Sequence, residues 1–146
     1  MLKHHSLEHH FVRHLPEVLE PGSLYVSMEY ATASHLCCCG CGCGEEVVTP
    51  FTPAQWKMSF DGETVSLNPS VGNWLQKCRS HYVIRNGKVI EAGPWSDEQI
   101  AAGLAHDKVA RVAMFEKIGS PLAKAAPDPM PFGKKSILAK LKAWIR

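Results

Sequence analysis

The sequence predicts a mainly β (α+β) fold, a small β module followed by C-terminal helices. Up to about residue 93, short runs of β-forming residues alternate with turn dipeptides. Beyond Gly93-Pro94 the apolar residues recur at helical spacing instead. All six cysteines lie in two places inside the β region, residues 37–43 and 78, each close to a histidine, so this region also carries the candidate chemistry.

Composition sets the broad class. The chain has 146 residues, 45% hydrophobic and 21% charged, which is typical of one globular domain and excludes wholesale disorder. The net charge of +2 is too small to indicate a nucleic-acid partner. No secretory signal and no apolar run of about 18 residues is present, so we expect a cytoplasmic protein. In a reducing cytosol, cysteines bind metals or catalyse more often than they form disulfides.

The expected strands follow in chain order. Two hairpins are predicted by the turn dipeptides Asp61-Gly62 and Asn86-Gly87, which favour tight reversals. Residues 1–10 hold four of the eight histidines and have two interpretations, a metal-binding tract or a mobile, soluble terminus, of which we favour the second. The remaining strand signals cover residues 11–15, 23–30, 47–49, 56–60, 64–67, 81–85 and 88–90.

The C-terminal part divides by composition. Ser96 and Gln99 form a capping box that begins a packed helix over 96–118, after a zinc-binding β domain over 1–95. Residues 119–133 contain four of the ten prolines and predict a Pro-rich linker. Residues 134–146 form a basic amphipathic helix with five basic residues and no acid. This helix has three interpretations: contact with an anionic membrane surface, contact with an acidic partner, or packing on its own domain.

The zinc prediction comes from two cysteine-rich segments. Zinc takes four thiolate or imidazole ligands in a tetrahedron, and the glycines beside Cys39 and Cys41 allow the turn that two nearby ligands need. Cys78 and His81 supply a second half with C-x-x-H spacing. Eight donors compete for four positions, and spacing alone does not choose among them: His35, Cys37, Cys38, Cys39, Cys41, Cys43, Cys78 and His81.

A catalytic zinc would need a general base beside its bound water. Glu29 is the best candidate, on the strand that leads to His35, with Glu45 and Glu46 as alternatives. Ser80 could donate a hydrogen bond to an oxyanion. In the plain interpretation, each glutamate is a solvated carboxylate and Ser80 only closes a turn.

Several segments resemble a bacterial family, the BubE-like proteins, associated as peptidases with ubiquitin-like conjugation pathways. The resemblance covers about residues 11–93 and is carried by residues 24–42, 47–50, Trp56, 67–73 and 78–82. It implies a metal-dependent protease that matures ubiquitin-like precursors or removes their conjugates. It also implies the functional residues Glu29, His35, Cys37, Cys39, Cys41, Cys78, Ser80 and His81. The Cys43-Gly44 pair departs from the family pattern by extending the Cys-Gly run.

Two functions are therefore weighed. The first is a zinc-dependent peptidase or isopeptidase whose metal hydroxide attacks a carbonyl after a ubiquitin-like tail, with Glu29 as proton shuttle. An extended tail could add along a sheet edge. The second is a non-enzymatic, zinc-stapled protein-interaction module, in which four protein ligands close the metal site. The number of protein ligands discriminates between them.

Overall fold

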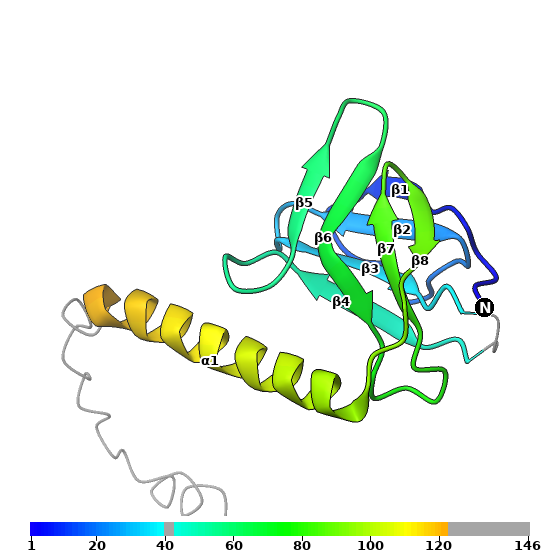
Figure 1. Ribbon diagram of the computed structural model, residues 1–146. Helices are drawn as coiled ribbons and strands as arrows, with labels where there is room; N and C mark the ends of the chain where they lie inside the picture. Colours follow the sequence, from blue (N-terminus) through cyan, green and yellow to red (C-terminus); the bar gives the residue numbers. More distant parts are fainter. Residues whose placement is uncertain (40–42, 123–146) are drawn as a thin grey trace, which may run out of the picture. The chain divides into compact units, whose positions relative to one another are not determined.

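Two four-stranded sheets and one helix make up the fold (Figure 1). The computed structural model describes residues 1–39 and 43–122, the last three of these by their backbone alone. The predicted mainly β class with a C-terminal helix is confirmed. Cys41, most of the predicted linker and the basic helix over 134–146 lie outside the described residues. The strands are β1 (Glu8–Phe11), β2 (Ser23–Ser27), β3 (Thr32–Leu36), β4 (Glu46–Pro50), β5 (Lys57–Phe60), β6 (Val65–Gly72), β7 (His81–Arg85) and β8 (Lys88–Glu91).

The strands follow chain order within each sheet, β1 to β4 and β5 to β8. Every pairing is antiparallel except β1 with β2, which is parallel. The sequence did not predict β3, because its residues, Thr-Ala-Ser-His-Leu, include few strong β-formers. Pairing with β2 on one side and β4 on the other makes this segment a central strand.

The N-terminal segment is part of the fold, so the prediction of a mobile terminus was wrong. Leu2 and Leu7 are buried. The backbone amides of Leu7 and Val89 donate to the carbonyls of Gly87 and His5, which joins this segment to the β7–β8 hairpin. The two leucines, lying among exposed polar residues, supply the apolar area that holds the segment down.

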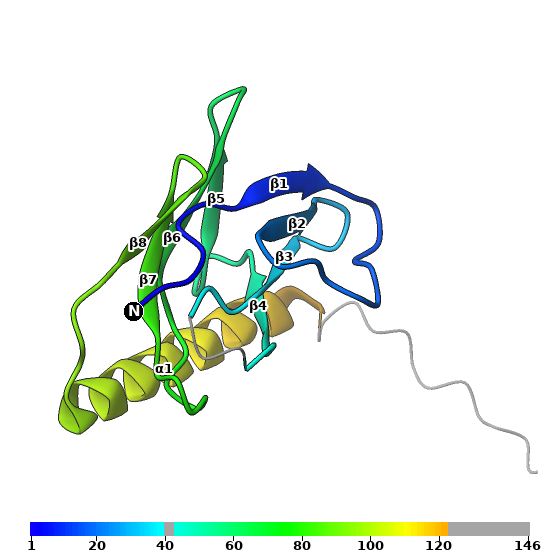
Figure 2. The ribbon, with the colours of Figure 1, turned by 90° about the vertical axis from the view of Figure 1, so that its right-hand side faces the viewer.

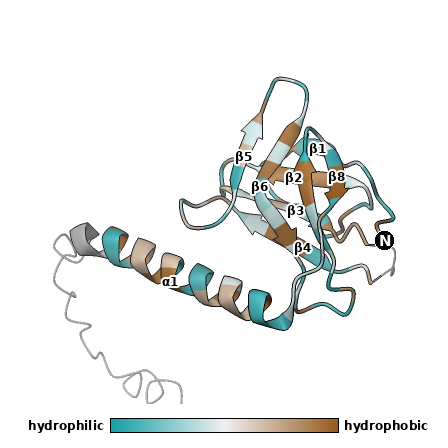
Figure 3. Ribbon diagram, in the orientation of Figure 1, coloured by the Kyte–Doolittle hydropathy of each residue, from teal (hydrophilic) through white to brown (hydrophobic). Residues whose placement is uncertain are grey.

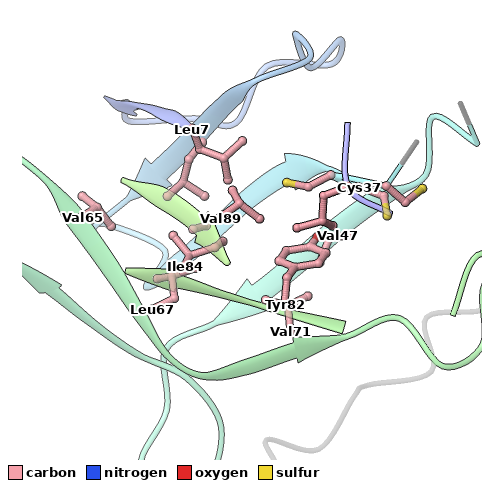
Figure 4. Close-up of a cluster of buried hydrophobic side chains, with 14 of the residues drawn as sticks. Leu7, Cys37, Val47, Val65, Leu67, Val71, Tyr82, Ile84 and Val89 are labelled. Atoms are coloured by element: carbon pink, nitrogen blue, oxygen red, sulfur yellow. The ribbon is translucent and has the colours of Figure 1, made fainter. Parts of the chain in front are cut away.

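Both sheets share one hydrophobic core (Figure 2). Leu24, Val26 and Ala33 enter it from the first sheet, and Leu67, Tyr82 and Ile84 are among those from the second. The apolar residues of β2, β6, β7 and β8 stand out in Figure 3. In Figure 4, Tyr82 lies at the Cys37 end of the core and Val65 at the other end.

Both predicted hairpin turns are present. Asp61 accepts hydrogen bonds from the Glu63 and Thr64 amides at 2.9 and 2.6 Å, which closes the β5–β6 turn. At the β7–β8 turn, Asn86 and Gly87 have φ of 50° and 69°. These left-handed values are those that a tight turn between twisted strands requires.

A bulge in β6 shapes the outer face of the second sheet. Leu67 pairs with Ile84 and Val71 pairs with Tyr82, so residues 68–70 of β6 lie opposite Val83 alone. Such insertions bend a strand and re-aim its side chains. Ser70 is the last of these three residues and directly precedes the point where regular pairing with β7 resumes.

The helix α1 (Asp97–Leu122) begins at the predicted capping box. The amide of Ser96 donates to Gln99 at 2.8 Å, and the amide of Gln99 donates back to Ser96 Oγ at 3.2 Å. Ile100 is buried, whereas Leu104, Val109, Val112, Phe115 and Ile118 are exposed. No helix in the described ranges has the length and apolar character needed to cross a membrane. Two compact units divide the chain, Met1–Phe115 and Glu116–Arg146, and the contacts analysed below lie within the first.

Candidate active site and metal centre

Among the residues that the structure describes, four cysteine sulfurs converge at one end of the core. Cys37, Cys39 and Cys43 come from the loop after β3, and Cys78 comes from the loop before β7. All four sulfurs lie within 4.8 Å of one another. The prediction that two segments distant in sequence meet at one site is confirmed for these cysteines.

The spacing of the sulfurs fits a tetrahedral zinc ion. With a Zn–S bond of about 2.3 Å, the sulfurs of a tetrahedral site lie about 3.8 Å apart. Cys37 and Cys78 sulfurs are 3.7 Å apart, and those of Cys39 and Cys43 are 3.5 Å apart. Four cysteines could thus hold a metal such as zinc, and together they would occupy all four positions of a tetrahedron.

Polar groups surround the sulfur of Cys37. Asn73 Nδ2 donates to this sulfur at 3.4 Å and to Ser80 Oγ at 2.9 Å. Ser80 Oγ lies 3.2 Å from Cys37 Sγ and 3.5 Å from Cys78 Sγ. Donors that reach the ligand atoms orient them and tune the metal. The predicted catalytic residue Ser80 therefore contacts the cysteine cluster.

Burial and hydrogen bonding have opposite effects on the thiols. Burial raises the pKa of Cys37. Burial also opposes ionisation of Cys78, but hydrogen bonds with Ser80, Cys39 and Cys37 together outweigh it and lower the pKa of Cys78 to about 7. Cys38 is fully buried in the core, and this burial raises its pKa to about 12. Cys38 therefore behaves as a small apolar side chain, whereas Cys78 ionises readily.

His35, a predicted ligand, lies outside the four-cysteine group. Its Nε2 is hydrogen-bonded to the Tyr82 hydroxyl at 2.9 Å, and its Nδ1 has no partner among the described residues. Complete burial lowers the pKa of His35 to about 4, which keeps the imidazole neutral. Tyr82 links His35 to the shell around the cysteines, because Asn73 Nδ2 also donates to the Tyr82 hydroxyl at 3.4 Å.

His81, the first residue of β7, meets Ser70 and not the cysteine sulfurs that Ser80 contacts. The Nε2 atom of His81 lies 2.9 Å from Ser70 Oγ, and its Nδ1 lies 2.8 Å from the carbonyl oxygen of Gly93. A carbonyl oxygen can only accept, so Nδ1 carries the proton of the neutral imidazole. Nε2 is then the bare nitrogen and accepts from the Ser70 hydroxyl. This is the arrangement of a nucleophilic serine with its general base.

Strand register brings this pair together. Gly72 of β6 is paired with His81 of β7, and Ser70 lies two residues before Gly72, on the same face of the strand. Ser70 is therefore a diagonal neighbour of His81. Ser70 is partly buried, and His81 is mostly buried.

Two tryptophans lie against His81. The ring centroids of Trp74 and Trp95 are 4.9 and 5.2 Å from that of His81, and the two indoles stack at 5.3 Å and 19°. Nearby, a cleft of about 500 Å³ runs between the cysteine cluster and His81. Its lining includes Cys39, Cys78, Ser80, His81, Glu91 and Pro94.

A comparison with protein-family models identifies the family. Residues 11–92 match BubE, described as the bacterial ubiquitination-like system serine protease. The chain belongs to the BubE family. Neither a search of curated proteins nor a search of solved structures gave a significant match. BubE proteins are thus serine proteases by description, a class of hydrolase, and their pathway points to ubiquitin-like partners.

A serine protease, the activity that the BubE description names, needs a serine paired with a base. Among the sequence-predicted residues, the structure brings Cys37, Cys39 and Cys78 together, and Cys43 joins them in place of the histidines. Glu29 is half-exposed and bonded to Arg13 at 2.7 Å, in the turn between β2 and β3. The cysteine cluster follows the other end of β3, so the structure does not bring Glu29 to it.

Ser70 was missed as a functional residue, although residues 67–73 belong to the segments that resemble BubE. No strand was predicted over Asn68-Pro69-Ser70, because proline usually interrupts a strand. A usable signal was present. A serine after a strand break, and a histidine at the start of the following hairpin, can face each other across neighbouring strands.

Proposed function

We propose that this BubE protein is a serine protease in which Ser70 is the nucleophile and His81 the general base. One observation carries the proposal: His81 Nε2 accepts from the Ser70 hydroxyl at 2.9 Å, while Nδ1 donates to Gly93 at 2.8 Å. The family description, which specifies a serine protease, agrees with this chemistry. The proposal replaces the metal-hydroxide mechanism with Glu29 as proton shuttle.

The reaction follows from the two hydrogen bonds. His81 Nε2 takes the hydroxyl proton as Ser70 Oγ attacks the substrate carbonyl carbon. The imidazolium then gives this proton to the leaving amine as the C–N bond breaks, which leaves an acyl group on Ser70. Water attacks the ester with His81 again as base, and the carboxylate product and free serine result.

The third member of the site is a backbone carbonyl. Gly93 holds the imidazole in the tautomer that leaves Nε2 free to accept. A carbonyl dipole stabilises the imidazolium less than a full carboxylate charge would. We therefore expect the orientation of His81, supplied by its surroundings, to matter more here than electrostatic support from the third group.

The proposed metal has a structural role. Four thiolates would close the coordination sphere and leave no position for a reacting water. When bound, zinc would cross-link the loop after β3 to the loop that carries Cys78, only three residues before His81. Dependence on zinc would therefore be dependence of the fold, and of the position of His81, on the metal.

The proposed substrates are ubiquitin-like proteins with an extended C-terminal tail, either as precursors or as conjugates. The family's pathway supports this partner. The cleft, which is lined by both polar and apolar groups, reaches the proposed base His81 and could receive a flexible segment beside it.

Labelling with a fluorophosphonate, which reacts with activated serines, tests the proposal directly. The zinc-loaded chain should be labelled at Ser70 and should cleave a ubiquitin-like fusion protein. Ser70→Ala should lose both, while Ser59→Ala, which removes an exposed serine of β5, should keep both. Equal labelling and cleavage by Ser70→Ala would overturn the proposed nucleophile.

The second candidate is the zinc-stapled interaction module. The four-cysteine group is as compatible with this module as with the protease. It differs in predicting binding without cleavage. A Ser70→Ala protein that binds a ubiquitin-like protein, beside a wild type that binds equally but neither reacts nor cleaves, would support the module.

A further inference from the structure

Three rings form a compact cluster on the outer face of the second sheet. The centroids of His81, Trp74 and Trp95 are 4.9 to 5.3 Å apart, so each ring touches the other two. Hydrogen bonds hold the imidazole at both nitrogens, but two hydrogen bonds still allow the ring to tilt about the line that joins the partners. Contacts with the indoles remove that freedom.

Two glycines make room for the tryptophans. A Cβ at Gly72 would overlap the indole of Trp74, and a Cβ at Gly103 would lie 3.0 Å from Cζ3 of Trp95. Gly103 lies inside α1, where glycine is unfavourable. Close packing of Trp95 on the helix gives a physical reason for this residue.

The first turn of α1 contacts the segment that carries His81. Arg79 and Asp97 form an ion pair at 2.6 Å, and Ile100 is buried. The amide of Ala92 donates to the carbonyl of His81 at 2.8 Å, which tethers the segment leading to Trp95 to the backbone of His81. Trp95 is therefore held between α1 and the imidazole.

We propose that Trp95, seated on Gly103 of α1, is a positioning residue for His81. It keeps the imidazole plane in the orientation in which Nε2 meets Ser70 and Nδ1 meets Gly93. The inference rests on the proposed serine chemistry and deepens it. Gly93, Trp95 and Gly103 all lie beyond residues 11–92, so a part of the chain outside the family match completes the site.

The helix offers a matched pair of variants. Gly103→Leu and Gly119→Leu both replace a glycine of α1 by a strong helix former, but an added Cβ at Gly119 meets no described atom within 4 Å. Gly103→Leu and Trp95→Ala should slow fluorophosphonate labelling of Ser70 by about tenfold or more, since general-base catalysis contributes roughly 10²–10⁴-fold. Gly119→Leu and the conservative Trp95→Phe should stay within about threefold of the wild type.

Two further measurements separate positioning from other roles. For cleavage of a ubiquitin-like fusion, Trp95→Ala should lower kcat and leave KM nearly unchanged. In histidine-selective ¹⁵N spectra, the Nδ1-protonated tautomer of His81 should be dominant in the wild type and lost or averaged in Trp95→Ala. Thermal unfolding of the zinc-loaded variants identifies any that fail to fold; if Trp95→Ala does, Gly103→Leu compared with Gly119→Leu carries the comparison.

The possible results are distinguishable. A raised KM with unchanged kcat would make Trp95 a substrate contact and overturn the inference, as would unchanged labelling in both Gly103→Leu and Trp95→Ala. A wild type that is never labelled would overturn the proposed function. The ¹⁵N spectra would still show whether Trp95 fixes His81 in that case.

Discussion

Ser80 and His81 are neighbours in the chain, yet they serve different sites. Successive residues of an extended segment point to opposite faces. Ser80 points inward to the sulfurs of Cys37 and Cys78, and His81 points outward to Ser70. Serine and histidine are each suited to either role, so chemical type alone does not assign them. The face of the sheet does.

The two sites also differ in how firmly they are held. The cysteine cluster joins two loops, and Asn73 and Ser80 add polar contacts to its sulfurs. The serine–histidine pair depends on one carbonyl and two indole rings. We infer that the inner site determines whether the domain folds and the outer site determines whether it reacts.

Loss of the metal should have the largest effect. Structural zinc contributes about 10–16 kcal/mol in small domains, which matches or exceeds a typical folding stability of about 5–15 kcal/mol. Chelation, or Cys39→Ser, should therefore unfold the domain, as measured by circular dichroism and metal analysis. Cys38→Ala is the control: it should keep one zinc per chain and cost about 1–2 kcal/mol. Equal zinc loss from both variants would contradict the assignment.

Substituting Ser70 on one face and Ser80 on the other should separate the effects on the reaction from those on folding. Ser70→Ala should reduce cleavage by about 10⁴-fold or more with unchanged thermal stability. Ser80→Ala should weaken zinc affinity by about 10–100-fold in chelator competition, with near-normal cleavage at saturating zinc. The comparison between the faces fails if Ser80→Ala abolishes cleavage by zinc-loaded, folded protein.

Breaking the link between His35 and the cluster should lower the stability moderately. Tyr82→Phe removes the hydroxyl that bonds His35 and leaves Nε2 of the buried imidazole without this partner. An unsatisfied buried polar group costs about 1–3 kcal/mol. Urea unfolding of the zinc-loaded protein should show this loss, with the metal content unchanged. A stability equal to the wild type would mean that the hydroxyl does not support His35.

The smallest effect should come from the β5–β6 turn. Amide hydrogen bonds from Thr64 and Glu63 lower the pKa of Asp61 from 3.8 to about 2. Because the folded-state pKa is the lower one, this carboxylate stabilises the turn fully above pH 3.8, and the contribution is lost as pH falls through about 2. Carbonyl-detected NMR titration should give the low pKa. Asp61→Asn should slightly lower Tm without changing zinc content or labelling, and an unshifted titration would contradict the turn geometry.

Local chemistry made much of the fold predictable. Asp61-Gly62 and Asn86-Gly87 specified their turns, and the Ser96–Gln99 capping box specified the start of α1, because each signal acts within a few residues. The sequence also predicted that the cysteine-rich loop meets Cys78, since a run of thiols beside glycines has few other uses.

Only the tertiary structure decided which donors meet. Cys43 completes the four-cysteine group, His35 bonds Tyr82 in the core, and Glu29 pairs with Arg13 in a turn that the length of β3 separates from the cluster. Ser70 meets His81 because Gly72 pairs with His81 and Ser70 lies two residues before Gly72 on the same face of β6. Turn and cap preferences are set by adjacent residues and can be read along the chain. Register and facing depend on pairing between segments far apart in sequence, and that pairing fixes the chemistry of this protein.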